Sequence, residues 1–92
     1  MYSHVFRSGQ DPTRHPTVIL IHGLGGTLNI WDPIVSVLEH RFSVLRYDLR
    51  GHGQSDVPAG DWSLEDFVSD LESIFNNESV PYAHLVLSLI HI

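Results

Sequence analysis

The hydrophobic pattern along the chain predicts short strands separated by helices. Val18–Ile21 is apolar on both faces and mostly β-branched, as expected for a central strand of a parallel sheet that helices cover on both sides. Residues 42–47 are expected to form a second strand, and residues 83–86 to begin a third after Pro81. Tyr2–Arg7 alternates loosely before a cluster of turn formers, so we expect an edge strand that turns back toward the next one.

A first helix is expected after the glycine-rich residues 23–26. Its apolar side chains recur at i, i+3, i+4 and i+7, the spacing of one helix face; they are Trp31, Ile34, Val35 and Leu38. Asn29 or Asp32 can cap its start, and Pro33 is tolerated in a first turn. His40 and Arg41 then place basic groups at the carboxyl end, where the helix dipole favours them.

A second helix has the clearest pattern in the chain. Ser63 and Asp66 resemble a capping box at its start, and Asn76–Asn77 followed by Pro81 marks its end. Its apolar stripe consists of Leu64, Phe67, Val68, Leu71, Ile74 and Phe75. Because strands that alternate with helices form right-handed crossovers, the predicted fold class is α/β, with a mostly parallel sheet and flanking helices.

Composition narrows the classes of partner. The chain has 92 residues and a net charge of -6, which argues against a nucleic acid or an anionic membrane as partner, since both require a basic face. The chain contains no cysteine, which excludes disulfides and thiolate metal sites. No basic-then-apolar leader follows Met1, and the longest purely apolar run, Val18–Ile21, is too short to span a bilayer, so we expect a cytoplasmic protein.

Two glycine-rich loops follow the first two central strands. His22-Gly-Leu-Gly-Gly26 comes directly after the first, and Arg50-Gly-His-Gly-Gln-Ser55 comes shortly after the second. In open α/β sheets ligands bind at the carboxyl ends of the strands, which is where both loops are expected. In this order and spacing, Thr17–Gly26 and Val44–Asp56 resemble the opening of an α/β-hydrolase.

The resemblance to α/β-hydrolases implies roles for the first loop. In that family the turn directs the backbone N–H of Leu24 into the site, where it stabilises the oxyanion of a tetrahedral intermediate, while Gly23 and Gly25 provide the loop geometry. His22 is implied to support the loop rather than touch substrate. The nucleophile, acid and catalytic histidine of the family lie downstream of this segment. The implied reaction is hydrolysis of an ester, a lactone or a related bond in a small molecule, without cofactor or metal.

A finer similarity points to 3-oxoadipate enol-lactonases. Residues 31–33, 42–48 and 51–58 are similar to theirs, as is the helix start Ser63-Leu-Glu-Asp-Phe67. The departure lies at His22-Gly23, where many enol-lactonases have Asn-Ser. This pair leaves other activities of the superfamily open, among them those of esterases, epoxide hydrolases and carbon–carbon bond hydrolases.

A dinucleotide-binding unit of an oxidoreductase is the main alternative. Gly23-Leu24-Gly25 follows a strand and opens a helix, and Asp48 stands at the end of the next strand, roughly where a ribose-binding acid belongs. Against this alternative, Leu28 occupies the position of the third glycine, which close packing of helix and strand requires. The second glycine loop also has no role in it.

The second glycine loop has a purely architectural interpretation. Gly51 and Gly53 permit positive φ angles, which tight turns require. The side chains of Asp48, Arg50 and Ser55 can hydrogen-bond to backbone groups around the turn. We therefore expect Asp48 to be structural rather than catalytic.

The carboxyl end of the chain departs from the hydrolase pattern. A Gly-x-Ser-x-Gly elbow would follow Val86, but Ser88 has no glycine two positions before or after it, so we do not expect it to be the nucleophile. Leu87–Ile92 matches the translation of a transposon-end adaptor used in sequencing libraries, and we expect it to be non-native. Residues 1–92 are therefore predicted to be an N-terminal fragment of a single α/β-hydrolase domain that is inactive alone.

Overall fold

The computed structural model describes residues 2–23 and 26–88 of the chain. Within these residues four strands form one sheet in the order β1-β3-β2-β4. They are β1 (Val5–Gly9), β2 (Thr17–Ile21), β3 (Ser43–Tyr47) and β4 (His84–Leu87). β2 runs parallel to both β3 and β4, whereas β1 pairs antiparallel with β3. The sheet is therefore mixed but mostly parallel, as predicted.

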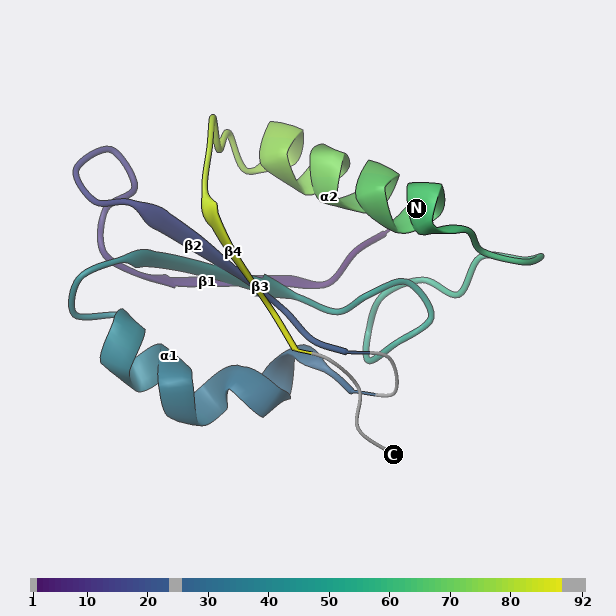
Figure 1. Ribbon diagram of the computed structural model, residues 1–92, viewed down its shortest axis with the longest axis horizontal. Helices are drawn as coiled ribbons and strands as arrows, with labels where there is room; N and C mark the ends of the chain where they lie inside the picture. The colour runs from purple at the N-terminus through teal and green to yellow at the C-terminus, as the bar shows by residue number, and fades with distance from the viewer. Residues whose placement is uncertain (1, 24–25, 89–92) are drawn as a thin grey trace.

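Helices cover both faces of this sheet. A 3-10 helix, η1 (Leu28–Trp31), leads directly into α1 (Asp32–Leu38), and α2 (Leu64–Asn77) follows the long loop after β3. α1 lies against one face of the sheet and α2 against the other (Figure 1). In the part of the chain that the structure describes, none of the helices combines the length and apolar character that a membrane crossing requires. The α/β fold class predicted from the sequence is confirmed.

The first strand differs from its prediction in position and in partner. β1 continues through Ser8 and Gly9, which the sequence pattern assigns to a turn. Gly9 has a φ of +86°, and a Cβ there would lie 2.4 Å from the Phe42 carbonyl oxygen, so this strand end requires a glycine. β1 is an edge strand, but it pairs with β3 rather than with β2. The connection from β1 to β2 passes the start of β3, where the Ser43 N–H donates to the Pro16 oxygen.

The first helix is shorter than predicted and is capped differently. The side chain of Thr27 caps η1 by accepting the Asn29 N–H at 3.3 Å, so Asn29 is not the cap. Asp32 is not a cap either, because it is the first residue of α1, and its carboxylate forms an ion pair with an arginine of β3. α1 ends before His40 and Arg41, which lie in the turn beyond it.

α2 agrees with its prediction at both ends. Ser63 and Asp66 form the capping box, in which the Ser63 N–H donates to the Asp66 carboxylate at 2.8 Å. The helix ends at Asn77, as predicted. The apolar stripe is only partly covered, since Ile74 is 2% exposed and Leu64 is 79% exposed. One end of the stripe therefore packs into the core, and the other lies at the surface.

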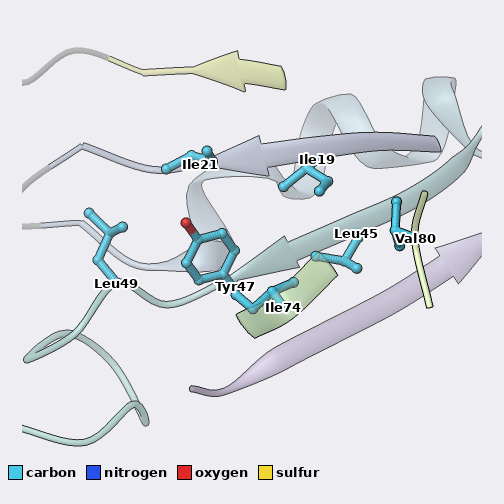
Figure 2. Close-up of a cluster of buried hydrophobic side chains, with 7 residues drawn as sticks. All are labelled: Ile19, Ile21, Leu45, Tyr47, Leu49, Ile74 and Val80. Carbon is cyan, nitrogen blue, oxygen red and sulfur yellow. The ribbon is translucent and has the colours of Figure 1, made fainter. Parts of the chain in front are cut away.

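Two clusters of buried apolar side chains fill the two faces of the sheet. Figure 2 shows the cluster on the α2 face, which consists of Ile19, Ile21, Leu45, Tyr47, Leu49, Ile74 and Val80. The cluster on the α1 face consists of Val18, Leu20, Trp31, Val35 and Val44. Residues 18–21 of β2 alternate between the two clusters, as do Val44 and Leu45 of β3. This confirms that the continuous apolar run of β2 is a strand covered on both sides.

Candidate active site

His22 lies at the carboxyl end of β2 and is almost completely buried, with 1% of its surface exposed. Its Nε2 accepts the Leu49 N–H at 2.9 Å, so the ring proton lies on Nδ1, which donates to the Gly23 oxygen at 2.7 Å. Burial lowers the pKa of His22, because it disfavours the imidazolium form. The neutral ring therefore links the end of β2 to the residue that follows Asp48.

Asp48 is a second buried link, at the end of β3. Its Oδ1 accepts the Leu28 N–H at 2.7 Å, and its Oδ2 accepts the Gln54 N–H at 3.0 Å. The side chain is 3% exposed, and Oδ1 lies 3.9 Å from Nε2 of His22. A ribose-binding acid must present its carboxylate to the ligand, but both oxygens of Asp48 face backbone amides in the interior. The geometry therefore argues against the dinucleotide alternative.

The segment before β1 holds the outer side of the second glycine loop. The Ser55 hydroxyl donates to the Asp48 carbonyl oxygen at 2.6 Å and accepts the His4 N–H at 2.8 Å. The Asp56 N–H donates to the Tyr2 oxygen at 2.9 Å, and the Tyr2 N–H donates to the Asp56 carboxylate at 2.6 Å. Ser55 and Asp48 thus bond to backbone groups, as the architectural interpretation predicts.

Arg50 differs from that interpretation. Instead of bonding around its own turn, its guanidinium forms a bidentate pair with Asp70 of α2, with both N–O distances 2.8 Å. A bidentate pair fixes orientation as well as distance, so it attaches the loop firmly to the helix. The sequence does carry a signal for this partner. Asp70 lies between Phe67 and Leu71 on the apolar face of α2, where an acidic residue needs a partner.

Two glycines of the second loop are required by close neighbours. Gly51 has a φ of +75°, and a Cβ there would lie 2.2 Å from the Trp62 ring. Gly53 has a φ of +49°, and its Cβ would lie 2.2 Å from Oδ2 of Asp48. The Trp62 ring is itself held by its Nε1–H, which donates to the Pro58 oxygen at 3.0 Å. The positive φ angles predicted for this loop are confirmed, and space as well as conformation demands glycine.

An apolar hollow of about 450 Å³ opens between α2 and the carboxyl ends of the central strands. Its lining includes His22, Gly23, Tyr47 and Leu71, together with Leu87 and Ser88 of the tail that the sequence predicts to be non-native. Burial raises the pKa of Tyr47 to about 12, with the charge of Asp70 as a second cause, so its hydroxyl stays protonated. The size and the mostly apolar lining are typical of a small-molecule site. Among residues 2–23 and 26–88, no three potential ligand side chains gather as a metal site would require.

The predicted site residues fall into two groups. His22 and Gly23 border the hollow. Leu24 and Gly25 lie outside the described residues, so the direction of the Leu24 N–H stays a prediction. Ser88 also borders the hollow, and its N–H donates to the last residue of β2 at 2.9 Å, which continues the β4 ladder. The remaining residues of the predicted non-native tail, 89–92, are outside the described residues.

Two contacts at this edge of the sheet are not predicted from the sequence. One is the bond from Leu28 to Asp48, which joins residues 20 positions apart. The other involves Arg46 of β3, which donates to the Leu28 oxygen at 3.1 Å, pairs with Asp32 and lies 5.0 Å from the Phe6 ring centre. The sequence indicates only that Arg46, a single charged residue inside a buried strand, needs a polar partner; it does not indicate which residue that partner is.

Comparisons with known proteins agree with this geometry. A family model described as alpha/beta hydrolase fold matches residues 16–88. The crystal structure of the enol-lactonase from Burkholderia xenovorans LB400 is similar, with a TM-score of 0.88 and 32% identity, over 92% of this chain and 33% of that one. The structure of a hydrolase from Pseudomonas aeruginosa PA01 has a TM-score of 0.84 and 34% identity, over 90% of this chain and 31% of that one.

Among curated proteins, the pimeloyl-[acyl-carrier protein] methyl ester esterase of Methylococcus capsulatus is 54% identical over 52 residues, which are 56% of this chain and 20% of the esterase. The chain thus spans a third or less of the length of these relatives. The range that the family model matches contains β2, β3, β4, the helices and both glycine loops. Since nearly all of the described fold lies within this range, the chain belongs to the α/β-hydrolase fold family.

Proposed function

We propose that the whole protein that carries this segment is a hydrolase that cleaves an ester, a lactone or a related bond of a small molecule. The observation that carries the proposal is the meeting of two interlocked loops beside an apolar hollow, at the carboxyl ends of parallel strands. The relatives named as an enol-lactonase and a methyl ester esterase support the same class of reaction.

In this proposal the backbone N–H of Leu24 is one donor of an oxyanion hole. Negative charge develops on the substrate carbonyl oxygen when the nucleophile attacks, and a fixed N–H stabilises that charge. Gly23 and Gly25 give the turn its geometry, and His22 supports it through the bond to the Gly23 oxygen. Loss of one such donor lowers kcat by about 10²–10³-fold. The loop is therefore expected to act on kcat more than on KM.

The nucleophile, the acid and the catalytic histidine are proposed to lie beyond Val86 in the whole protein. A Ser-His-Asp type triad transfers the acyl group first to the nucleophile and then to water, with the histidine moving the proton in both steps. No cofactor or metal is needed for this chemistry. His22 is unsuited to the role of base, because its Nε2 is occupied by the Leu49 N–H and its Nδ1 bonds to the Gly23 oxygen.

An enol-lactone is the narrower substrate class that we propose. It is supported by the local sequence similarity at residues 31–33, 42–48 and 51–58, and by the likeness to the Burkholderia enol-lactonase. The pair His22-Gly23, in place of Asn-Ser, is the feature that favours a different ester or lactone.

The 92-residue chain alone is proposed to be inactive. Its outer strand β4 exposes Leu85, Val86 and Leu87 by 44%, 41% and 63%, although β4 pairs with the central strand β2. An apolar strand at the edge of a sheet favours association between chains. We therefore expect the isolated chain to self-associate and to show no turnover.

Hydrolysis by the whole protein tests the proposal. Purified whole protein is assayed with p-nitrophenyl butyrate and with 3-oxoadipate enol-lactone, and the 92-residue chain serves as the matched control. We expect turnover of at least one substrate by the whole protein and of neither by the chain. A folded whole protein that hydrolyses no ester or lactone, but whose melting temperature rises with NAD, would contradict the proposal in favour of the dinucleotide alternative.

A further inference from the structure

We propose that Asp48 is a positioning residue for the hydrolysis proposed above, because its carboxylate fixes the far end of the glycine loop. This inference rests on the proposed function. Residues 23–27 connect β2 to η1 and include the predicted oxyanion donor, Leu24. A short loop is positioned by the contacts at its two ends, which here are contacts of Gly23 and Leu28.

Both ends of the loop are held by consecutive residues at the carboxyl end of β3. At the near end, His22 donates to the Gly23 oxygen at 2.7 Å and accepts the Leu49 N–H at 2.9 Å. At the far end, the Leu28 N–H donates to Oδ1 of Asp48 at 2.7 Å. A displacement of residues 48–49 would therefore move both ends of the loop together.

The far end of the loop depends on the carboxylate of Asp48. Leu28 opens η1, so its N–H is one of the amides that a helix start leaves without an intrahelical partner. The Thr27 side chain caps Asn29, not Leu28. Leu28 is 5% exposed, so loss of the carboxylate would leave its N–H buried without this acceptor. This cost ties the loop to Asp48.

Asp48 can act only through the loop. Its side chain is 3% exposed, and both carboxylate oxygens are occupied by backbone N–H groups, those of Leu28 and Gln54. The carboxylate lies beside Gly53, where an added Cβ would be 2.2 Å from Oδ2, so a side chain at position 53 would displace it. The Ser55 hydroxyl holds the Asp48 carbonyl oxygen at 2.6 Å. The second glycine loop thus sets the position of the first.

The experiment compares Asp48→Asn with Asp56→Asn in the whole protein. Asparagine keeps the shape of Asp48 but offers one acceptor oxygen, so either Leu28 or Gln54 loses its partner. Asp56 is the matched control, because its carboxylate accepts the Tyr2 N–H at the exposed side of the same loop. Two quantities are measured: kcat and KM with p-nitrophenyl butyrate, and amide hydrogen exchange at Leu28 and Gln54.

For Asp48→Asn we expect kcat to fall about ten- to a hundredfold with KM changed less than about threefold, since misplacing the loop affects the transition state most. Exchange at Leu28 or Gln54 should accelerate roughly tenfold or more. Asp56→Asn should change neither quantity, because its amide oxygen can still accept its one partner, the Tyr2 N–H. Because partly unfolded protein also lowers the apparent kcat at unchanged KM, kcat is calculated per folded molecule, with the folded fraction taken from urea-induced unfolding.

Several results would overturn the inference. Free-amide exchange rates at Leu28 and Gln54 in the wild-type protein would show that the carboxylate does not hold the loop, whether or not any variant folds. An active wild type with unchanged kcat in Asp48→Asn would remove the positioning role and leave the proposed function intact. A wild type that hydrolyses no ester or lactone would remove the proposed function, and this role with it, even where the Leu28 amide is protected.

Discussion

The loops that follow β2 and β3 differ from the outer strand β4 in how completely their side chains are buried and bonded. In the loops, His22, Asp48 and Ser55 are buried, and the side chain of each makes two hydrogen bonds to backbone groups. Along β4, all four residues are exposed although the strand lies beside the central strand β2. The loop network is specified by residues of this segment, whereas the cover of β4 requires side chains that the described residues do not supply.

Paired leucine truncations give the largest expected effect. Leu45 on β3 is 0% exposed and Leu87 on β4 is 63% exposed. Leu45→Ala should lower the free energy of unfolding by about 2–5 kcal/mol, because it leaves a cavity in the core, and Leu87→Ala by less than about 0.5 kcal/mol. Urea-induced unfolding of the 92-residue chain, followed by tryptophan fluorescence at a concentration low enough to keep the chain monomeric, measures both. Equal losses at the two positions would show that β4 is as well packed as β3.

A glycine pair tests the crowding of the second loop. Gly53 and Gly60 both have positive φ angles, +49° and +88°. A Cβ at Gly53 would lie 2.2 Å from the Asp48 carboxylate, whereas a Cβ at Gly60 would meet no atom of the described residues within 4 Å. Both alanine variants carry the cost of a left-handed conformation. Gly53→Ala should be less stable than Gly60→Ala by about 1–3 kcal/mol, because of the added overlap. The same unfolding assay decides, and equal stabilities would mean that the carboxylate moves aside freely.

Acid should weaken the loop network through His22. Because burial lowers the pKa of His22 in the folded state, the unfolded chain binds its proton first as pH falls. The usual pKa of a histidine in an unfolded chain is about 6.5. The stability that neutral His22 contributes is fully present above this pH and is lost as the pH falls below it. His22→Gln should be less stable than wild type at pH 7.5 and lose less on acidification. His84→Gln, on exposed β4, is the control, and urea midpoints at pH 7.5, 6.5 and 5.5 provide the measurement.

Leu87→Lys should have the smallest effect on stability. It tests directly whether the exposed strand β4 causes the chains to associate. A lysine on an edge strand opposes pairing between chains, while its cost to a residue 63% exposed should stay within about 0.5 kcal/mol. We expect sedimentation velocity to show less self-association of the 92-residue chain than in wild type. An unchanged association state would place the contact between chains elsewhere.

The elements that can be predicted from the sequence are those whose signals are local. The apolar run of β2 predicts a buried strand, and the capping box of Ser63 and Asp66 predicts where α2 begins. The start of the first helix is predicted less well. Asn29 and Asp32 are both good caps by type, but Thr27 caps η1 and Asp32 turns to an arginine of β3. Tertiary partners override local preference there.

The connections of the candidate site could be predicted only in part. The need for turns at Gly51 and Gly53 follows from the sequence, as does bonding of Asp48 and Ser55 to backbone. Which backbone groups they would reach does not, because the Leu28 amide lies 20 residues from Asp48 along the chain. The pairing of β1 with β3 rather than β2 is of the same kind, since it depends on the path of the chain past β3 rather than on the strand itself.

The pairing of Tyr2 with Asp56 has a consequence for anyone who engineers this chain. The backbone of residues 2–4 runs along the outer side of the second loop, so additions at the amino end are made next to the scaffold of the site and not at a remote terminus. A fusion partner joined rigidly there would compete with the bonds to Ser55 and Asp56. A flexible spacer of glycine and serine before the fusion would leave those backbone groups free to pair.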